Sequence, residues 1–210
     1  SGNRYKMSSS QSSSFGKLFV VSAPSGAGKT SIIKKIIDDK NNVRMSISHT
    51  TRQPRAGEID GVDYHFISSE TFLKMSRNSD FLEEAKVFDN LYGTSKAEVQ
   101  QTLVAGLDVI LEIDWQGAAQ VRQKLPSTQS IFIFPPSLDA LRDRLENRAQ
   151  DDVETVDKRM SAVFEELSHW QEFDYLIVND QFDTALAQLQ SVVAGQGSDH
   201  HISKQIKALG

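Results

Sequence analysis

A glycine-rich turn near the start of the chain lies between two apolar segments of different periodicity. Before it, residues 18–21 are consecutively apolar, which is typical of a buried strand. After it, residues 32–37 contain four isoleucines at helical spacing. The turn, residues 23–30, reads Ala-Pro-Ser-Gly-Ala-Gly-Lys-Thr and matches the phosphate-binding loop except at Ala23, where that motif has glycine. This order of strand, turn and helix predicts an α/β fold that binds a phosphate group.

The side chains of the turn fit that chemistry. Gly26 and Gly28 allow the backbone to wrap an anion with its N–H groups inward. Lys29 is placed to reach the β- and γ-phosphates of a nucleotide, and the Thr30 hydroxyl to bind Mg²⁺. The helix that begins near Lys29 adds its positive N-terminal end. An ordinary tight turn with a surface lysine is the alternative, and the flanking strand and helix argue against it.

The rest of the chain alternates between strand and helix signals. Apolar runs predict further strands at 109–114, 131–134 and 175–178, each suited to burial on both faces. Helical patterns fill 96–105, 117–124, 138–147, 154–172 and 183–194. Ser95 and Glu98 form a predicted capping box, and Gly106 a stop signal. We therefore expect an α/β fold of the P-loop NTPase type, a parallel sheet with helices on both faces.

Two stretches interrupt the alternation, and the two ends differ from the rest. Residues 46–94 predict a small inserted domain of mixed structure, with a strand near 82–88. Residues 138–160 carry many charges and few core candidates, which predicts an exposed helical flap. The core domain then comprises 16–45, 95–137 and 161–195. We expect a disordered serine-rich leader at 1–15, partly added ahead of a native start at Met7, and a tail of uncertain order at 196–210.

Composition excludes several classes of protein. The 210 residues include no cysteine, which rules out a disulfide framework and cysteine-ligated metals and fits the cytoplasm. No apolar run approaches the ~18 residues of a membrane span. A net charge of −5 disfavours general nucleic-acid binding. The five histidines show no helical spacing with acidic residues, so we expect no metal site from them.

An arginine pair follows in the stretch 48–58, which reads Ser-His-Thr-Thr-Arg-Gln-Pro-Arg-Ala-Gly-Glu. Arg52 and Arg55 lie on either side of Pro54, which stiffens the segment. In an extended chain both guanidinium groups can converge on one phosphate, and the planar fork of arginine bonds phosphate oxygens two at a time. Taken alone, the segment is equally consistent with a solvated loop.

Together these segments resemble the guanylate kinase family. The motifs occur in order between residues 18 and 189: the loop 23–30, the stretch 48–58, Asn-Leu-Tyr-Gly-Thr-Ser at 90–95, Glu-Ile-Asp-Trp-Gln-Gly at 112–117 and Phe-Asp-Tyr-Leu-Ile-Val-Asn-Asp at 173–180. The resemblance implies a P-loop core with a GMP-binding insert and a helical lid. It also implies transfer of the γ-phosphoryl group of ATP to GMP or dGMP in purine nucleotide metabolism, with Mg²⁺ as cofactor.

The resemblance assigns roles by motif position. It implies that the ATP-binding residues are Ala23, Pro24, Ser25, Gly26, Ala27, Gly28, Lys29, Thr30, Ser31, Arg144, Arg148 and Asn179, with Asn179 near the adenine. It implies that the GMP-binding residues are Ser48, Arg52, Arg55, Tyr64, Glu83, Tyr92, Thr94 and Asp114. The implied catalytic residues are Lys29, Arg52, Arg148 and Arg159, and the implied metal ligand is Thr30.

Glu83 has a physical reason to read guanine. Guanine presents two adjacent donors, N1–H and the 2-amino group, and an ionised carboxylate can only accept. Adenine offers no matching pair on that edge. If the strand alternates regularly, Glu84 faces the opposite side and is a solvated neighbour.

Three positions depart from the family pattern. Glu112 stands where an aspartate is common, which puts a Mg²⁺ contact in doubt, Ala149 replaces a glycine of the lid, and Thr94 replaces a serine. Two other functions stay open. A non-catalytic peptide-binding module on the same scaffold has no use for Lys29, and a kinase for a phosphorylated sugar has no use for the guanine readers. The oligomeric state is left open.

Overall fold

The computed structural model describes residues 14–148 and 153–201. Its core is a five-stranded parallel sheet in the order β2-β7-β1-β8-β9. The four predicted apolar runs form β1, β7, β8 and β9, which confirms the predicted fold class. The edge strand β2 was not predicted, because Val43 is its one buried residue. The strands are β1 (Leu18–Ser22), β2 (Val43–Met45), β7 (Asp108–Glu112), β8 (Gln129–Phe134) and β9 (Tyr175–Val178).

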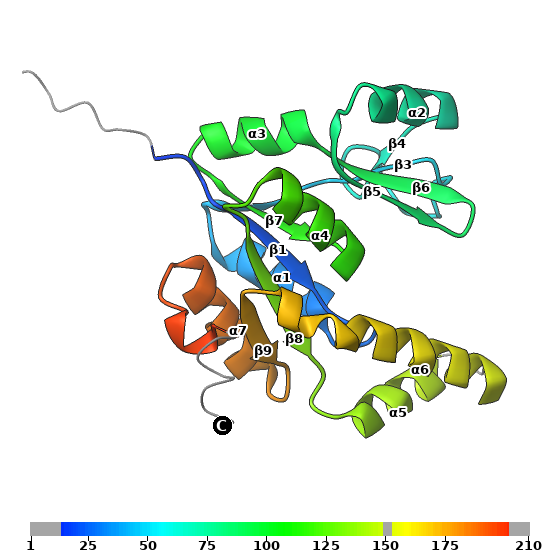
Figure 1. Ribbon diagram of the computed structural model, residues 1–210, viewed down its shortest axis with the longest axis vertical. Helices are drawn as coiled ribbons and strands as arrows, with labels where there is room; N and C mark the ends of the chain where they lie inside the picture. The colour runs from blue at the N-terminus through cyan, green and yellow to red at the C-terminus, as the bar shows by residue number, and fades with distance from the viewer. Residues whose placement is uncertain (1–13, 149–152, 202–210) are drawn as a thin grey trace, which may run out of the picture.

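Helices cover both faces of this sheet, as predicted (Figure 1). On one face, Phe19 and Val21 of β1 pack with the isoleucines of α1 and the apolar side of α7. On the other, Leu18 and Val20 pack with α3 and α4. The alternation of β1 between two buried layers explains why its sequence is apolar at every position. The helices are α1 (Lys29–Asp39), α3 (Lys96–Val104), α4 (Trp115–Lys124) and α7 (Phe182–Val193).

A second, four-stranded sheet lies at one end of the molecule in the order β4-β3-β6-β5. Strand β3 pairs parallel with β4 and antiparallel with β6, which also pairs with β5. Helix α2 packs against it through Phe72, which stacks on Phe81. The elements are β3 (His49–Thr50), β4 (His65–Phe66), α2 (Ser69–Arg77), β5 (Phe81–Val87) and β6 (Asn90–Ser95).

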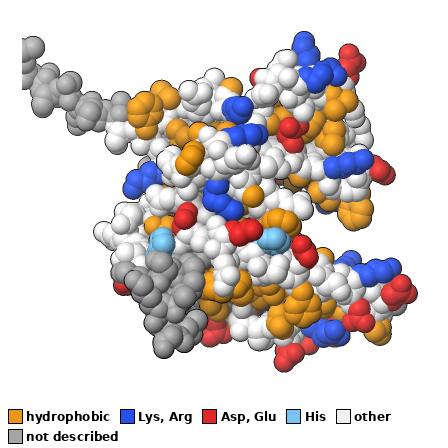
Figure 2. Space-filling view, in the orientation of Figure 1, with side chains coloured by type: hydrophobic (Ala, Val, Ile, Leu, Met, Phe, Trp, Pro, Cys, Tyr) orange, Lys and Arg blue, Asp and Glu red, His pale blue; other side chains and the backbone are white. Residues whose placement is uncertain are grey.

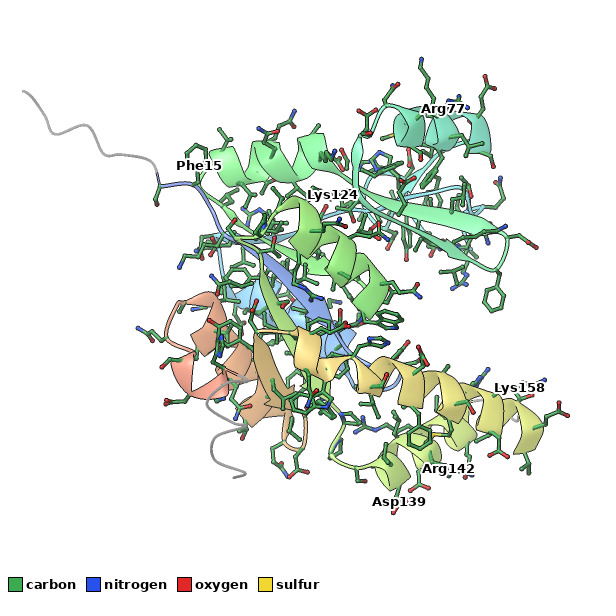
Figure 3. The ribbon with its side chains drawn as sticks, viewed as in Figure 1. Phe15, Arg77, Lys124, Asp139, Arg142 and Lys158 are labelled. Carbon is green, nitrogen blue, oxygen red and sulfur yellow. The ribbon has the colours of Figure 1, made fainter. Side chains whose placement is uncertain are left out.

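Helix α4 of the core holds the edge of this second sheet. Lys124 Nζ donates to the carbonyl oxygens of Phe81 and Leu82 at 3.1 and 2.9 Å. Gln120 exchanges two hydrogen bonds with the backbone of Glu84. In Figure 3, Lys124 lies between α4 and the second sheet. The insert is therefore fastened to the core by side chains that satisfy the open edge of β5.

A helical pair, α5 (Leu138–Arg148) and α6 (Val153–Ser168), extends from the same side of the core as the insert (Figure 1). Arg142 of α5 pairs with Asp157 of α6 at 3.1 Å. The expectation of few core candidates in 138–160 was wrong, since the pair encloses its own apolar cluster. The residues of this cluster are spaced so that they lie on the facing sides of the two helices. They are Leu141, Leu145, Val156, Met160 and Val163.

Two local predictions also need correction. Ser95 Oγ caps α3 by accepting from Glu98 N, but the Glu98 carboxylate turns to His65 instead of completing the capping box. The helix predicted at 154–172 ends at Ser168, and the 3₁₀ turn η1 (Trp170–Glu172) follows because Trp170 packs against Phe134. In the predicted tail, 196–201 include the 3₁₀ turn η2 (Ser198–His200).

Some sequence predictions fall outside the described ranges. These are the disordered leader up to residue 13, Ala149 and the tail from residue 202 onward. Among the described helices, none combines the length and apolarity that crossing a bilayer requires.

Candidate functional site

The surface is hollowed between the second sheet and the α5–α6 pair (Figure 2). Two adjoining cavities of about 460 and 360 Å³ share the lining residues Lys29, Thr30 and Asp114. The smaller one is lined by all of residues 23–31. The larger one extends to the insert, where Ser48, Tyr64 and Thr94 line it. The predicted phosphate loop and part of the predicted GMP site thus open onto one continuous region.

The phosphate loop has the backbone that its sequence predicts. Gly26 and Gly28 have φ of +85° and +84°, a region that favours glycine. Among the described non-glycine residues only Ser79 and Phe88 have positive φ, so Ala23 keeps an ordinary conformation and its departure from the motif is mild. Helix α1 begins directly after Gly28, which directs its N-terminal N–H groups into the smaller cavity.

Two side chains from distant parts of the chain hold this loop. Asn179, at 8% exposure, donates from Nδ2 to the carbonyl oxygen of Ala27 at 2.8 Å. Arg144 of α5 donates to the carbonyl oxygen of Gly26 at 2.8 Å. A Cβ on Gly28 would lie 2.6 Å from Asn179 Nδ2, so the close approach also requires glycine there. Asn179 therefore braces the loop, and its contact with adenine stays a prediction.

Acidic side chains surround Lys29. Its Nζ lies 4.0 Å from Glu112 Oε1, and each of the two side chains is 19% exposed. Burial lowers the pKa of Lys29, while Glu112, Glu166 and Asp114 oppose that shift. Thr30 Oγ1 donates to Glu112 Oε1 at 2.5 Å. The longer Glu112, in place of the common aspartate, thus contacts both functional side chains of the loop.

Arg52 is held in a two-bond ion pair with Glu58. The guanidinium donates to both carboxylate oxygens at 3.0 and 2.8 Å, and Arg55 N donates to Glu58 Oε2 at 2.7 Å. Hydrogen bonding by the Arg52 guanidinium lowers the pKa of Glu58 to about 2. The Tyr64 ring lies under the same guanidinium, with 5.3 Å between the ring centroid and Arg52 Cζ. A phosphate that reaches Arg52 therefore meets a guanidinium already fixed in place.

The aromatic residues predicted near the GMP phosphate gather around Arg52. Tyr64 and Tyr92 lie edge to face with ring centroids 6.0 Å apart. Burial raises the pKa of Tyr64, with Tyr92 adding to the shift and Arg52 opposing it. The Tyr64 hydroxyl therefore stays protonated near neutral pH and can donate. The structure brings Arg52, Tyr64 and Tyr92 together.

Glu83 is a buried carboxylate, at 4% exposure, on β5 of the insert. Its Oε1 accepts from Thr94 Oγ1 at 2.7 Å. Burial raises the pKa of Glu83 to about 6, and the hydrogen bond from Thr94 opposes the shift. Glu84 is half-buried and bonded through its backbone to Gln120. The register with β6 is irregular between Phe81 and Glu83, where three successive residues are buried, and the pairing is regular from Glu83 onward.

A third cavity, of about 680 Å³, joins the insert, the phosphate loop and the lid. Ser25, Arg55, Arg159 and Glu166 line it. Arg55 thus faces the lid, while Arg52 faces Glu58, so convergence of the two on one phosphate stays a prediction. The sequence analysis missed Glu166, which also lines the loop cavity. The sequence does indicate Glu166, because Glu166 follows Arg159 by seven residues and so lies on the same face of one helix.

Two predicted residues need separate mention. Asp114 Oδ1 accepts from Gly117 N at 2.7 Å and caps α4, so this side chain is fixed where the two main cavities meet. Arg148 ends α5 four residues after Arg144 and shares its helix face. The side chain of Arg148 lies outside the described part of the chain.

Comparison with known proteins gives one consistent family. The family model described as guanylate kinase matches residues 15–196. The chain is 58% identical over 179 residues to a guanylate kinase of Pseudomonas fluorescens, covering 85% of this chain and 87% of the relative. It is 56% identical over 178 residues to one of Saccharophagus degradans, with the same shares covered.

A solved structure agrees with these relatives. The crystal structure of guanylate kinase from Anaplasma phagocytophilum matches with a TM-score of 0.70 and 30% identity, over 90% of this chain and 91% of that one. With a family model over most of its length and relatives more than half identical, the chain belongs to the guanylate kinase family.

Proposed function

We propose that this chain transfers the γ-phosphoryl group of ATP to GMP or dGMP in the cytoplasm, with the phosphate loop holding ATP and the insert holding GMP. The observation that carries the proposal is the meeting of the two cavities at Lys29, Thr30 and Asp114. One cavity is lined by the phosphate loop and the other reaches the insert. A phosphoryl group moving between two nucleotides would have to cross this point. Guanylate kinase activity itself follows from the close relatives.

On the ATP side, residues 23–31 supply backbone N–H donors and the positive end of α1. Lys29 supplies a charge for the β- and γ-phosphates. Its acidic neighbours Glu112, Glu166 and Asp114 oppose the lowering of its pKa by burial. Since the phosphate of GMP is already an anion near neutral pH, the reaction needs no strong general base. Positioning and charge neutralisation carry most of the catalysis.

The residues beside Lys29 fit a Mg²⁺ ion. Thr30 Oγ1 and the Glu112 carboxylate lie together at 2.5 Å, and Asp114 lines the same two cavities. These are oxygen donors, which Mg²⁺ prefers, and a few protein oxygens suffice because the ion keeps several waters. When bound, Mg²⁺ would supply positive charge that offsets the charge of the phosphates. Thr30 and Glu112 would hold it.

On the GMP side, Arg52 offers its fixed guanidinium to the phosphate, with the hydroxyls of Tyr64 and Tyr92 as further donors. The ion pair with Glu58 orients the Arg52 guanidinium, which can still bind a doubly charged phosphate. Arg55 approaches from the lid side of the same stretch. Ser48, which lines the larger cavity, is placed to contact the base.

The base itself is read by Glu83. Its ionised carboxylate accepts from N1–H and the 2-amino group of guanine, while Thr94 holds Oε1 in orientation. AMP would leave this buried carboxylate unpaired, and a site built to bond a substrate group rejects analogues lacking it by ~10⁴ or more. Glu83 therefore sets the preference for guanine.

The lid completes the site. Arg144 already contacts the phosphate loop, Arg159 lines the cavity shared with Ser25, and Arg148 follows Arg144 on the same face. We propose that the insert, residues 46–94, and the lid, residues 138–160, close on their nucleotides and exclude water, because arginines from both must meet one phosphoryl group. The core comprises 16–45, 95–137 and 161–195.

A coupled ADP-release assay with a panel of acceptors tests the proposal. ATP with GMP should give rapid ADP production, and ATP with AMP or ribose bisphosphate should give about 10⁴-fold less at equal concentration. Turnover with ribose bisphosphate above that with GMP would favour the sugar-kinase alternative. Absence of ADP with every acceptor would favour the peptide-binding module.

A further inference from the structure

Two histidines and a glutamate meet where the insert joins the core, and none of the three lines either nucleotide cavity. His49 of β3 and His65 of β4 are directly paired in the parallel register, so their rings lie on one face of the sheet, with centroids 4.5 Å apart. Glu98 of α3 approaches from the core, its Oε1 2.7 Å from His65 Nε2. Potential ligand atoms of all three lie within 4.8 Å of one another.

Unpartnered polar atoms mark the same point. Among the described residues, seven buried side-chain nitrogen or oxygen atoms have no hydrogen-bond partner. Three of them are His49 Nδ1, His65 Nε2 and Glu98 Oε2. The close approach of His65 to Glu98 is an ion pair in distance but lacks the alignment of a hydrogen bond. Buried polar groups left unpaired cost roughly 1–3 kcal/mol each, so a cluster of three calls for a missing partner.

We propose that His49, His65 and Glu98 form a site for a single Zn²⁺ ion that bridges the insert and helix α3. Two imidazoles and one carboxylate are a common donor set for zinc, with water in the fourth position. They are a poor set for Mg²⁺, which prefers oxygen donors. The site is therefore chemically distinct from the one at Thr30.

The geometry permits ligation after a small adjustment. Ligands about 2.0–2.1 Å from a tetrahedral zinc lie ~3.4 Å from one another. The three ligand atoms here lie within 4.8 Å of one another, and His65 Nε2 and Glu98 Oε1 are 2.7 Å apart, so a shift of the Glu98 carboxylate is needed. Glu98 can supply that movement, because its side chain is 41% exposed. It also lines a cavity of about 280 Å³ with Ser46 and Val99, which gives an ion a path from solvent.

The protonation state of the His49 ring suits a metal as well. Burial and the neighbouring His65 lower the pKa of His49, with Glu98 and Asp60 opposing the shift. A neutral imidazole is the form that binds metals. A bound ion would tie β3 and β4 to α3 and so hold the insert in one orientation on the core. Ser48, predicted to contact the base, directly precedes His49.

Zn²⁺ alone, titrated calorimetrically into the chelator-stripped full chain without nucleotide or Mg²⁺, tests the proposal. One equivalent should bind to the parent protein. His65→Gln and Glu98→Gln should each weaken that binding at least tenfold. His169→Gln is the matched control, because His169 also lies beside two carboxylates, Glu165 and Glu172. A second control replaces His200 and His201 together, and both controls should bind as the parent does.

Co²⁺ gives a second readout that does not depend on affinity. The parent should develop a visible absorption band typical of low-coordinate Co²⁺ with nitrogen ligands, and Glu98→Gln should change it. Zn²⁺ should also raise the Tm of the parent and not that of Glu98→Gln, a partly exposed position that tolerates substitution.

Absence of Zn²⁺ binding to the parent would overturn the proposal and leave the cluster as an ion-paired contact between insert and core. Binding that survives both His65→Gln and Glu98→Gln, but is lost in either control, would overturn it by placing the ion elsewhere.

Discussion

The phosphate loop and the GMP-binding insert prepare their anion sites in different ways. The loop uses backbone N–H groups set by two positive-φ glycines and the start of α1, and side chains such as Asn179 only hold it in shape. The insert uses side chains from separate segments, and two of these side chains already form hydrogen bonds within the insert. Arg52 bonds Glu58, and Glu83 bonds Thr94.

This difference separates binding of any phosphate from recognition of one base. Backbone donors bind phosphate whatever nucleoside carries it. Side chains held by internal partners have fixed orientation, so they discriminate between substrates. We therefore expect substitutions in the loop to affect catalysis, and substitutions in the insert to affect the choice and affinity of GMP.

Replacement of Lys29 should have the largest effect. Lys29→Met removes the charge that acts on the transferring phosphoryl group, so kcat should fall by at least ~10³. The KM for GMP should change little if GMP binds to the insert as proposed. Steady-state kinetics with varied GMP would measure both, and turnover within tenfold of the parent would show that the loop does not act through this lysine.

Replacement of Glu83 should have the next largest effect, and it tests the insert where Lys29 tests the phosphate loop. Glu83→Gln exchanges one acceptor for a donor facing guanine, so kcat/KM for GMP should drop ~10²–10³, equivalent to about 3–4 kcal/mol. Glu84→Gln, at the half-buried neighbour, should stay within a few-fold of the parent. Equal losses in the two variants would mean that the guanine reader lies elsewhere.

Loss of the brace on the loop should have a smaller effect. Asn179→Ala removes the donor to Ala27, so we expect kcat/KM for ATP to fall ~10-fold and the free energy of unfolding to drop by about 1 kcal/mol. Asp180→Ala, at the exposed neighbour, is the control and should change neither. A larger loss with varied GMP than with varied ATP would contradict a role confined to the loop.

The pH dependence of stability gives the most specific effect. The pKa of Glu83 rises from 4.5 to about 6 on folding, so the folded state binds a proton more tightly than the unfolded state. Ionised Glu83 therefore costs the folded protein about 2 kcal/mol above pH ~6, a cost that disappears below pH ~4.5. Urea unfolding should show Glu83→Gln more stable than the parent near pH 8, with the two equal near pH 4.5. A difference that grows on acidification would have the wrong sign.

The same contrast explains how much the sequence could predict. The loop and its flanking elements are contiguous, so a local pattern sufficed for Gly26, Gly28 and the fold around them. The apolar core of the lid was also visible in principle, as the spacing of Leu141 with Leu145, but the surrounding charges obscured it. The roles of the insert residues came from a family resemblance, because no local spacing predicts them.

Contacts between elements that lie far apart in the chain could not be predicted from the sequence. His49, His65 and Glu98 come from two strands and a helix, so their meeting depends on the register of β3 with β4 and on the position of α3. The hydrogen bond from Asn179 to the carbonyl oxygen of Ala27 likewise joins distant parts of the chain, while the contact of Asn179 with adenine stays a prediction. Such contacts depend on tertiary packing, which hydrophobic periodicity and composition do not determine.

Equilibrium titration of Lys29→Met and Glu83→Gln, each with GMP and with a non-hydrolysable ATP analogue, tests the division between loop and insert most directly. We predict that Glu83→Gln binds GMP at least tenfold more weakly and the ATP analogue within twofold of the parent. Lys29→Met should weaken the ATP analogue and leave GMP within twofold. A variant that weakens both ligands equally, or the reverse pattern, would contradict the account.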